Sequence, residues 1–182
     1  MASPRRLDDR YQRLELPSDP ASVQAANKMR WNGSRDAQRA QFFTVSYTGR
    51  SLETICDLLG AAGVATLIDI RFAPVSMYRP ETAKSNLSRF LTGEGIEYVH
   101  LPDLGVPRDV RIKAVESGNR QAIWTWYDEH VAQQFAGGNL DRFFNIAQHP
   151  IAFMCVEVDP TACHRHRLAL ALETRGLRGF DL

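Results

Sequence analysis

From residue 42 onward, the chain carries short runs of β-branched and aromatic residues that are separated by more polar, glycine-containing segments. Apolar runs of this length are typical of strands that are covered on both faces of a sheet. Strands are therefore predicted at residues 42–47 (FFTVSY), 64–70 (VATLIDI), 96–101 (IEYVHL) and 151–158 (IAFMCVEV). The final GFDL is expected to add a last short strand.

Segments with apolar residues at helical spacing lie between these runs. In the first of them, Leu52, Ile55 and Leu59 recur on one side, and Ser51 stands where a helix N-cap is expected. Helices are predicted at residues 51–63, 86–95, 108–117, 122–136, 140–147 and 164–176.

Strands that alternate with helices imply right-handed βαβ units and a parallel sheet. We predict an α/β fold: a single domain at residues 41–182, with a mainly parallel sheet of four to five strands flanked by helices. Residues 1–40 show no strand period and only weak helical spacing, which Pro17 and Pro20 interrupt. This segment is predicted to be an N-terminal arm that is partly helical or disordered.

The composition is that of an ordinary globular protein, with 44% hydrophobic residues, 24% charged residues and a formal net charge of +1. The arm is basic, because residues 1–50 hold nine Lys/Arg against five Asp/Glu. No apolar run approaches the roughly 20 residues that span a bilayer, and the N-terminus lacks the apolar stretch of a secretory signal. Three cysteines are too few for a disulfide framework. We therefore expect a reduced, cytoplasmic protein without a membrane partner.

Candidate functional residues follow each predicted strand. Ligands of open α/β sheets bind beyond the carboxyl ends of the strands, so the residues after these strands should converge there. The ligand-binding candidates are Tyr47, Arg50, Asp69, Arg71, Ser76, Tyr78 and Arg165. The catalytic candidates are His100, Glu157, Cys163 and His164.

The segment CVEVDPTACHRHR at residues 155–167 holds the densest group of these candidates. A helix that begins near Cys163 points free N–H groups at the sheet edge, which favours anions and lowers the pKa of a nearby thiol. Arg165 adds positive charge. Cys163 is therefore interpreted either as a reactive thiol or as support for a bound phosphate or carboxylate, whereas Cys155 is expected to be mainly a core residue.

Three other candidates keep a structural alternative. His100 could orient a neighbouring loop instead of transferring protons. Asp69, late in a buried strand, is expected to fix a loop through backbone N–H groups. Glu157 is either a general acid/base or the salt partner of Arg71 or Arg165.

A metal site is the weakest interpretation of this segment. Cys155, Cys163, His164 and His166 are enough ligands for zinc, but two histidines at i and i+2 of a helix cannot face one ion. A three-ligand site formed by both cysteines and His164, with or without His100, remains an alternative. The sequence does not predict a metal or a cofactor.

Four motifs appear in order along the chain: TVSYTGRSLE, TLIDIRFAPVS, GIEYVHLPDLG and FMCVEVDPTACHRHRLAL. With them the sequence resembles the DUF488 family over about residues 43–175. The resemblance implies a compact α/β domain, and the name of the family records that its activity is not generally established. The sequence matches the family pattern at fourteen positions: Ser51, Asp69, Arg71, Pro74, His100, Leu101, Pro102, Leu104, Gly105, Cys155, Glu157, Cys163, His164 and Arg165. The sequence departs from that pattern in the turn SYTGRS and at Val106.

The leading hypothesis is an enzyme of unknown reaction class with an anion- or nucleotide-binding pocket at the carboxyl edge, using Glu, His and Cys for acid–base or thiol chemistry. Its expected partner is an anionic small molecule or a nucleotide. The second hypothesis is a non-catalytic nucleic-acid-binding module that uses the basic arm. Under it, the aromatic cluster WTWY at residues 124–127, otherwise interpreted as core, would stack on bases. The third is a metal-dependent enzyme with Cys and His ligands.

Overall fold

The structure, a computed structural model, describes residues 37–136 and 147–182. Within these residues the chain forms one sheet of five parallel strands in the order β3-β2-β4-β1-β5. The strands are β1 (Phe42–Ser46), β2 (Thr66–Asp69), β3 (Glu97–His100), β4 (Ile151–Cys155) and β5 (Gly179–Asp181). The prediction of an α/β domain with four to five mainly parallel strands is confirmed.

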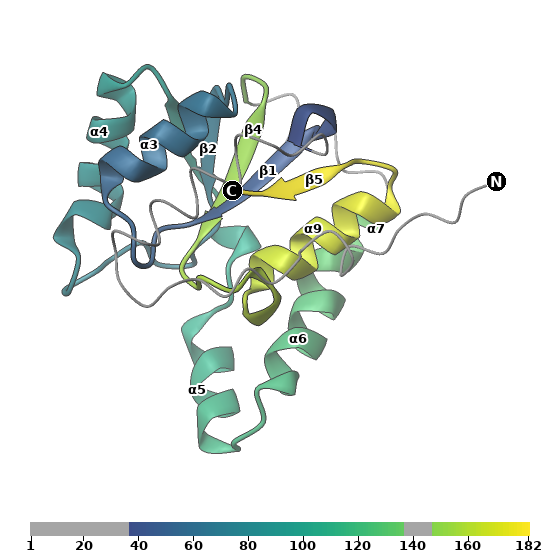
Figure 1. Cartoon of the computed structure of the whole chain (residues 1–182). Helices are drawn as coiled ribbons and strands as arrows, with labels where there is room; N and C mark the ends of the chain where they lie inside the picture. Colours follow the sequence, from purple (N-terminus) through teal and green to yellow (C-terminus); the bar gives the residue numbers. More distant parts are fainter. Residues whose placement is uncertain (1–36, 137–146) are drawn as a thin grey trace.

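Helices connect the strands and cover both faces of the sheet (Figure 1). The α-helices are α3 (Leu52–Ala61), α4 (Lys84–Gly93), α5 (Arg108–Glu116), α6 (Gln121–Tyr127), α7 (Gln133–Ala136) and α9 (His164–Thr174). Single 3-10 turns lie at η1 (Ala37–Arg39), η2 (Pro80–Thr82), η3 (Pro102–Leu104) and η5 (Pro160–Ala162), and a π-helical turn, η4, lies at Asp128–Ala132.

The apolar residues of each strand alternate between two cores, as the pleat of a strand requires. Phe42 and Ile68 pack on one face with Leu168 of α9. Phe43 and Leu67 pack on the other face with the buried residues of α3 and α4. Figure 1 shows α3 and α4 on one side of the sheet and α9 on the other. Because both faces are covered, β1, β2 and β4 are buried along their whole length and are rich in apolar and β-branched residues, whereas the edge strand β3 is exposed or half-buried.

The fourth strand is shorter than the sequence indicated. A strand was predicted at residues 151–158, but β4 ends at Cys155. The neighbouring strands explain the difference, because β1 ends at Ser46, opposite Cys155, and β2 ends at Asp69, opposite Met154. Residues 156–158 therefore have no strand beside them and leave the sheet toward η5.

The helical region after β3 also differs from the prediction. The helix expected at residues 122–136 consists of α6, the π-helical turn η4 and α7. Most of the helix expected at 140–147, and most of the predicted arm at residues 1–40, lie outside the described residues. Figure 1 shows α5 and α6 as a hairpin that extends beyond the end of the sheet, next to the start of α9.

Gly105 brings the start of this hairpin against the loop that follows β2. A Cβ atom added at Gly105 would lie 2.3 Å from the backbone nitrogen of Phe72 and 2.9 Å from the carbonyl oxygen of Ile70. Only glycine fits this approach of two backbones, so the residue joins η3 to the loop after β2. None of the helices in the described residues is long and apolar enough to cross a membrane.

Candidate functional site

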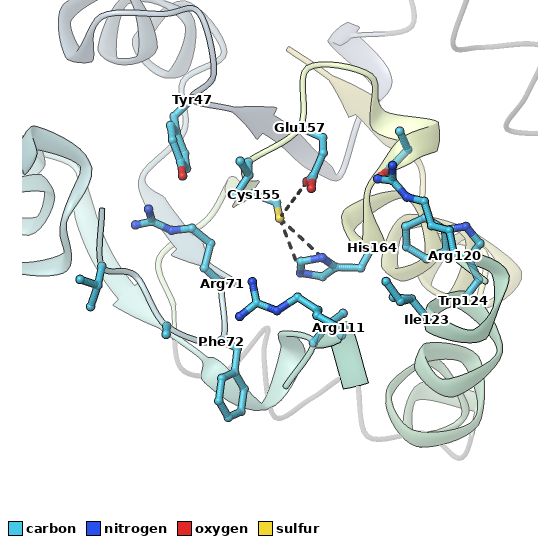
Figure 2. Close-up of a pocket in the computed structure, with 15 residues that line it drawn as sticks. Tyr47, Arg71, Phe72, Arg111, Arg120, Ile123, Trp124, Cys155, Glu157 and His164 are labelled. Atoms are coloured by element: carbon cyan, nitrogen blue, oxygen red, sulfur yellow. Dashed lines mark hydrogen bonds between the residues drawn. The ribbon is translucent and has the colours of Figure 1, made fainter. Parts of the chain in front are cut away.

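A pocket with a cavity volume of about 230 Å³ lies at the carboxyl edge of the sheet. Figure 2 shows its side chains converging from the ends of β1, β2 and β4 and from α5, α6 and α9. It is lined by Tyr47, Arg71, Phe72, Ala73, Val75, Val106, Arg111, Arg120, Ile123, Trp124, Cys155, Val156, Glu157, Ala162 and His164. The pocket thus occupies the position that parallel-sheet topology predicts for a ligand.

Three groups able to transfer protons meet at one point of the pocket wall. The Sγ atom of Cys155 lies 3.6 Å from both ring nitrogens of His164 and 3.8 Å from Oε2 of Glu157, as the dashed lines in Figure 2 show. His164 Nε2 also lies 3.2 Å from the carbonyl oxygen of Ile70. Since a carbonyl only accepts hydrogen bonds, Nε2 carries a proton, and Nδ1 is the ring nitrogen that can accept a hydrogen bond from the thiol.

Cys163 lies behind this group as the N-cap of α9, and its side chain does not line the pocket. Burial opposes its ionisation, but hydrogen bonds from Cys155 and His164 and the charge of His164 outweigh that effect, so the pKa of Cys163 is well below the usual value of a thiol. Burial and the contact with Cys163 raise the pKa of Cys155. Of the two thiols, Cys163 is therefore the one that ionises more readily, and the thiol of Cys155 faces the cavity.

The neighbouring carboxyl and imidazole respond to this buried charge. Burial and the nearby Cys163 sulfur raise the pKa of Glu157, which favours a protonated carboxyl. Burial opposes the charge of His164, but the hydrogen bond and charge of Cys163 outweigh it and raise the pKa of His164. A carboxyl whose pKa is shifted toward neutral values is suited to general acid–base work.

Arg71 lines the pocket, but most of its donors are already engaged. Its Nε and Nη2 donate to both carboxylate oxygens of Asp69, at 2.8 and 2.5 Å, and Nη2 also donates to the carbonyl of Thr82 at 2.8 Å. Asp69 further accepts from the backbone N–H of Arg71 and from the hydroxyl of Tyr98, at 2.7 Å. The guanidinium lies over the ring of Tyr47, 4.9 Å from its centroid. This network shapes the loop after β2 and leaves one face of Arg71 toward the cavity.

Arg165 is not part of the pocket wall. Its side chain is completely buried, with Nε 3.3 Å from Oδ1 of Asp181 and Nη2 3.1 Å from the carbonyl oxygen of Val158. Nη1 also donates to the carbonyl of Glu157. Arg165 therefore ties the chain that leaves β4 to β5. Glu157 makes neither of the two salt bridges considered for it, because Arg71 pairs with Asp69 and Arg165 with Asp181.

His100 lies beside the loop after β2 and outside the pocket. Its Nε2 lies 2.9 Å from the carbonyl oxygen of Arg71, and its Nδ1 lies 3.3 Å from Nζ of Lys84. An imidazole held in this way orients the loop that carries Arg71, which is the structural alternative considered for it.

The other three ligand-binding candidates also lie outside the pocket wall. Arg50 is buried and donates to the carbonyl of Ser46 at 3.2 Å. Ser76 Oγ accepts from the backbone N–H of Arg79 at 2.9 Å, and Tyr78 is 98% exposed. Arg79 in turn donates to the carbonyl of Tyr47 at 2.7 Å, so this loop is fastened to the end of β1.

The α5–α6 hairpin supplies pocket residues that the sequence interpretation missed. Arg120 donates to the carbonyl of Ala162 at 2.8 Å and lies over the ring of Trp124, 5.8 Å from its centroid. The guanidinium of Arg111 is directed into the cavity in Figure 2 and has no partner among residues 37–136 and 147–182. The i, i+3, i+4 spacing of Arg120, Ile123 and Trp124 puts them on one helix face, a signal that could have marked this wall.

Two cysteines and a histidine also form a group of donor atoms able to hold a metal ion. One donor atom each from Cys155, Cys163 and His164 lie within 4.8 Å of one another. This is the three-ligand alternative left open by the sequence, without His100, which faces Arg71 and Lys84 instead.

The fold and this pocket define a small α/β protein with a polar site at the carboxyl edge of a parallel sheet. Comparison with protein families matches residues 51–172 to the family described as "Domain of unknown function DUF488". The chain belongs to this family, so the resemblance in the sequence is confirmed. Neither the curated proteins nor the solved structures contain a match.

Proposed function

We propose that the protein is an enzyme that binds a small anionic substrate in the pocket at the carboxyl edge and acts on it by proton transfer. The observation that carries the proposal is the contact of a carboxyl, a thiol and an imidazole on one wall of a cavity that also receives a guanidinium without a partner among the described residues. Glu157 is the general acid/base, and Arg111 is the anion ligand. Burial, followed by the nearby Cys163 sulfur, raises the pKa of this carboxyl, which suits it to proton transfer.

The apolar part of the wall limits the substrate further. Ile123, Trp124 and Phe72 offer a surface for a planar or apolar group, whereas Arg111 and Arg120 suit a phosphate or carboxylate. A cavity of about 230 Å³ is below the roughly 300–1,000 Å³ typical of drug-sized ligands. The proposed substrate class is therefore a small organic anion no larger than a mononucleotide.

Arg71→Ala does not test this proposal cleanly, since Arg71 also supports the buried carboxylate of Asp69. Arg111→Ala is the better variant because the Arg111 side chain is exposed. Its matched control is Arg108→Ala, which removes an exposed arginine from the same helix but outside the pocket wall.

The experiment measures binding of inorganic phosphate, adenosine monophosphate and small carboxylates by calorimetry, and their conversion by mass spectrometry. We expect at least one of these anions to bind wild-type protein, with affinity about 10-fold or more weaker in Arg111→Ala and unchanged in Arg108→Ala. Glu157→Gln should still bind that anion but lose its conversion. Equal binding by the two arginine variants, or no binding to wild type, would refute the proposal.

The nucleic-acid hypothesis stays a prediction, because it depends mainly on the basic arm and residues 1–36 are outside the described part of the chain. Its test is the salt dependence of nucleic-acid binding with and without these residues. Lysines and arginines that contact phosphates would make binding fall steeply with salt, and their deletion would reduce that slope.

A further inference from the structure

The cluster of Cys155, Cys163 and His164 has the composition of a transition-metal site. Cys155 is the last residue of β4, and Cys163 and His164 lie at the start of α9, so the strand and the helix both contribute donor atoms. Both thiols are free and almost completely buried, each with 1% of its surface exposed. Two thiols and an imidazole are soft or borderline ligands, which favour zinc over magnesium or calcium.

The spacing of the donor atoms fits a tetrahedral ion. With Zn–S bonds near 2.3 Å and Zn–N bonds near 2.0 Å, a sulfur and a nitrogen on one ion lie about 3.5 Å apart and two sulfurs about 3.8 Å apart. Cys155 Sγ is 3.6 Å from His164 Nδ1, and all three donors lie within 4.8 Å of one another. Changes of at most about 1.3 Å in these separations would bring every pair to the expected distance.

A hydrogen bond gives the imidazole the tautomer that a metal ligand requires. His164 Nε2 lies 3.2 Å from the carbonyl oxygen of Ile70, to which it donates, and this leaves the lone pair on Nδ1, which lies 3.6 Å from Cys155 Sγ. Metal-binding histidines almost always donate their second ring N–H to a carbonyl, a carboxylate or water in this way. Ile70 directly follows β2, so the backbone at the end of this strand sets the tautomer.

The cluster also has an open side. Cys155 and His164 line the pocket, whereas Cys163 lies behind them. Three protein ligands with a fourth position open to a cavity are characteristic of catalytic zinc sites, in contrast to the closed four-ligand sites of structural zinc. Oε2 of Glu157 lies 3.8 Å from Cys155 Sγ, on the pocket side. A zinc ion bound to two thiolates is formally neutral, which suits a buried position.

We propose that Cys155, Cys163 and His164 bind a Zn²⁺ ion whose fourth coordination position faces the pocket beside Glu157. The zinc site extends the function proposed above. A role of the ion in substrate conversion rests on that proposed function. Binding of the ion itself does not depend on that function, so the two can fail separately.

The test is a titration of the full chain, purified under reducing conditions without a metal-affinity column and stripped with a chelator. Zn²⁺ is added in competition with a chromogenic chelator, and Co²⁺ is added in a parallel titration. We expect about one Zn²⁺ per chain. The Co²⁺ form should show the thiolate charge-transfer and tetrahedral d–d absorption bands.

Cys163→Ser is expected to weaken Zn²⁺ binding about 100-fold or more and to remove the charge-transfer intensity of one thiolate. The matched control is Cys56→Ser, because Cys56 lies on α3, outside this cluster. The control should bind Zn²⁺ like the wild type. Circular dichroism of each variant shows that it is folded, and the wild-type titration decides the proposal even where a variant is not.

Three outcomes would overturn the zinc site: no stoichiometric Zn²⁺ in reduced wild-type protein, equal loss of binding in Cys56→Ser and Cys163→Ser, or Co²⁺ spectra without thiolate bands. Anion binding that persists without any Zn²⁺ affinity would leave the proposed function standing while this proposal fails. Stoichiometric Zn²⁺ in a protein that binds none of the tested anions would support the zinc site and refute the proposed substrate class.

Discussion

Replacing Arg165 by methionine should destabilise the protein severely, although the sequence presents this arginine as a ligand residue. Its side chain is completely buried, and it donates to Asp181 and to the carbonyls of Glu157 and Val158. Arg165→Met keeps most of the side-chain volume and removes the charge and all the donors. The carboxylate of Asp181 would then remain buried without its counter-ion.

The size of the effect follows from these contacts. Removing one partner of a buried ion pair costs about 3–5 kcal/mol of the free energy of unfolding. Asp181 keeps the hydrogen bond from the Thr44 hydroxyl, which places this contribution near the lower end of the range. Each of the two carbonyls that lose a donor adds about 1 kcal/mol or less, because both residues are only half-buried. The expected total is about 4 kcal/mol, or a melting temperature lower by about 8–16 °C.

Urea unfolding at pH 7, followed by circular dichroism, measures this change. Arg111→Met is the control, since its exposed side chain has no partner among the described residues and the variant should stay within about 0.5 kcal/mol of wild type. The double variant Arg165→Met/Asp181→Leu should regain a large part of the loss, because it removes both buried charges together. If Arg165→Met is as stable as Arg111→Met, the assignment of Arg165 to the framework is wrong.

Two further predictions concern Gly105 and Cys56. Gly105→Ala should cost about 2–3 kcal/mol in urea unfolding, because the new Cβ would lie 2.3 Å from the backbone nitrogen of Phe72; a loss below 0.5 kcal/mol would mean that the two backbones separate easily. Burial, followed by the charges of Glu94 and Asp57, raises the pKa of Cys56 to about 11, so only about one thiol in a thousand is ionised at pH 8. Its alkylation by iodoacetamide, followed by peptide mass spectrometry, should be at least about 100-fold slower than in the urea-unfolded chain and should rise about tenfold per pH unit between pH 8 and 10. A rate that levels off below pH 10 would contradict the raised pKa.

The strands were predictable because a parallel sheet covered on both faces leaves a simple pattern in the sequence. Phe42 to Ser46 and Ile151 to Cys155 are buried at every position, so each is rich in apolar and β-branched residues. The end of β4 was not predictable from that pattern. Val156 and Val158 have the same strand propensity as the residues before them, and the strand stops only because its neighbours do.

The position of the candidate site was predictable from the sequence, but only some of its residues were. Topology alone indicates that Tyr47, Arg71 and Glu157 approach one edge of the sheet, and all three line the pocket. The orientation of an arginine cannot be derived from its position in the sequence, because the same side chain can face a ligand or bind the backbone behind a loop. For Arg165 the decisive partner, Asp181, lies in the last strand, and nothing in the local sequence pairs the two.

The pocket wall formed by α5 and α6 was also not predictable from the sequence. Arg111 and Arg120 were not predicted because the placement of a helical hairpin depends on tertiary contacts that the helix pattern does not encode. In the structure, Arg71 and Arg165 are buried, are paired with Asp69 and Asp181, and hold the loops in place.

In the proposed function, the residues that bind the anion and the residues that transfer protons lie on different parts of the fold. Arg111 and Arg120 belong to the α5–α6 hairpin, which extends beyond the end of the sheet, so a substitution there can alter the ligand without removing the ion pairs by which Arg71 and Arg165 hold the loops. The proton-transfer group of Glu157, Cys155 and His164 lies on the framework itself, between β4 and α9. Changes in the hairpin should therefore change which anion is bound, whereas changes in the framework group should change what happens to it.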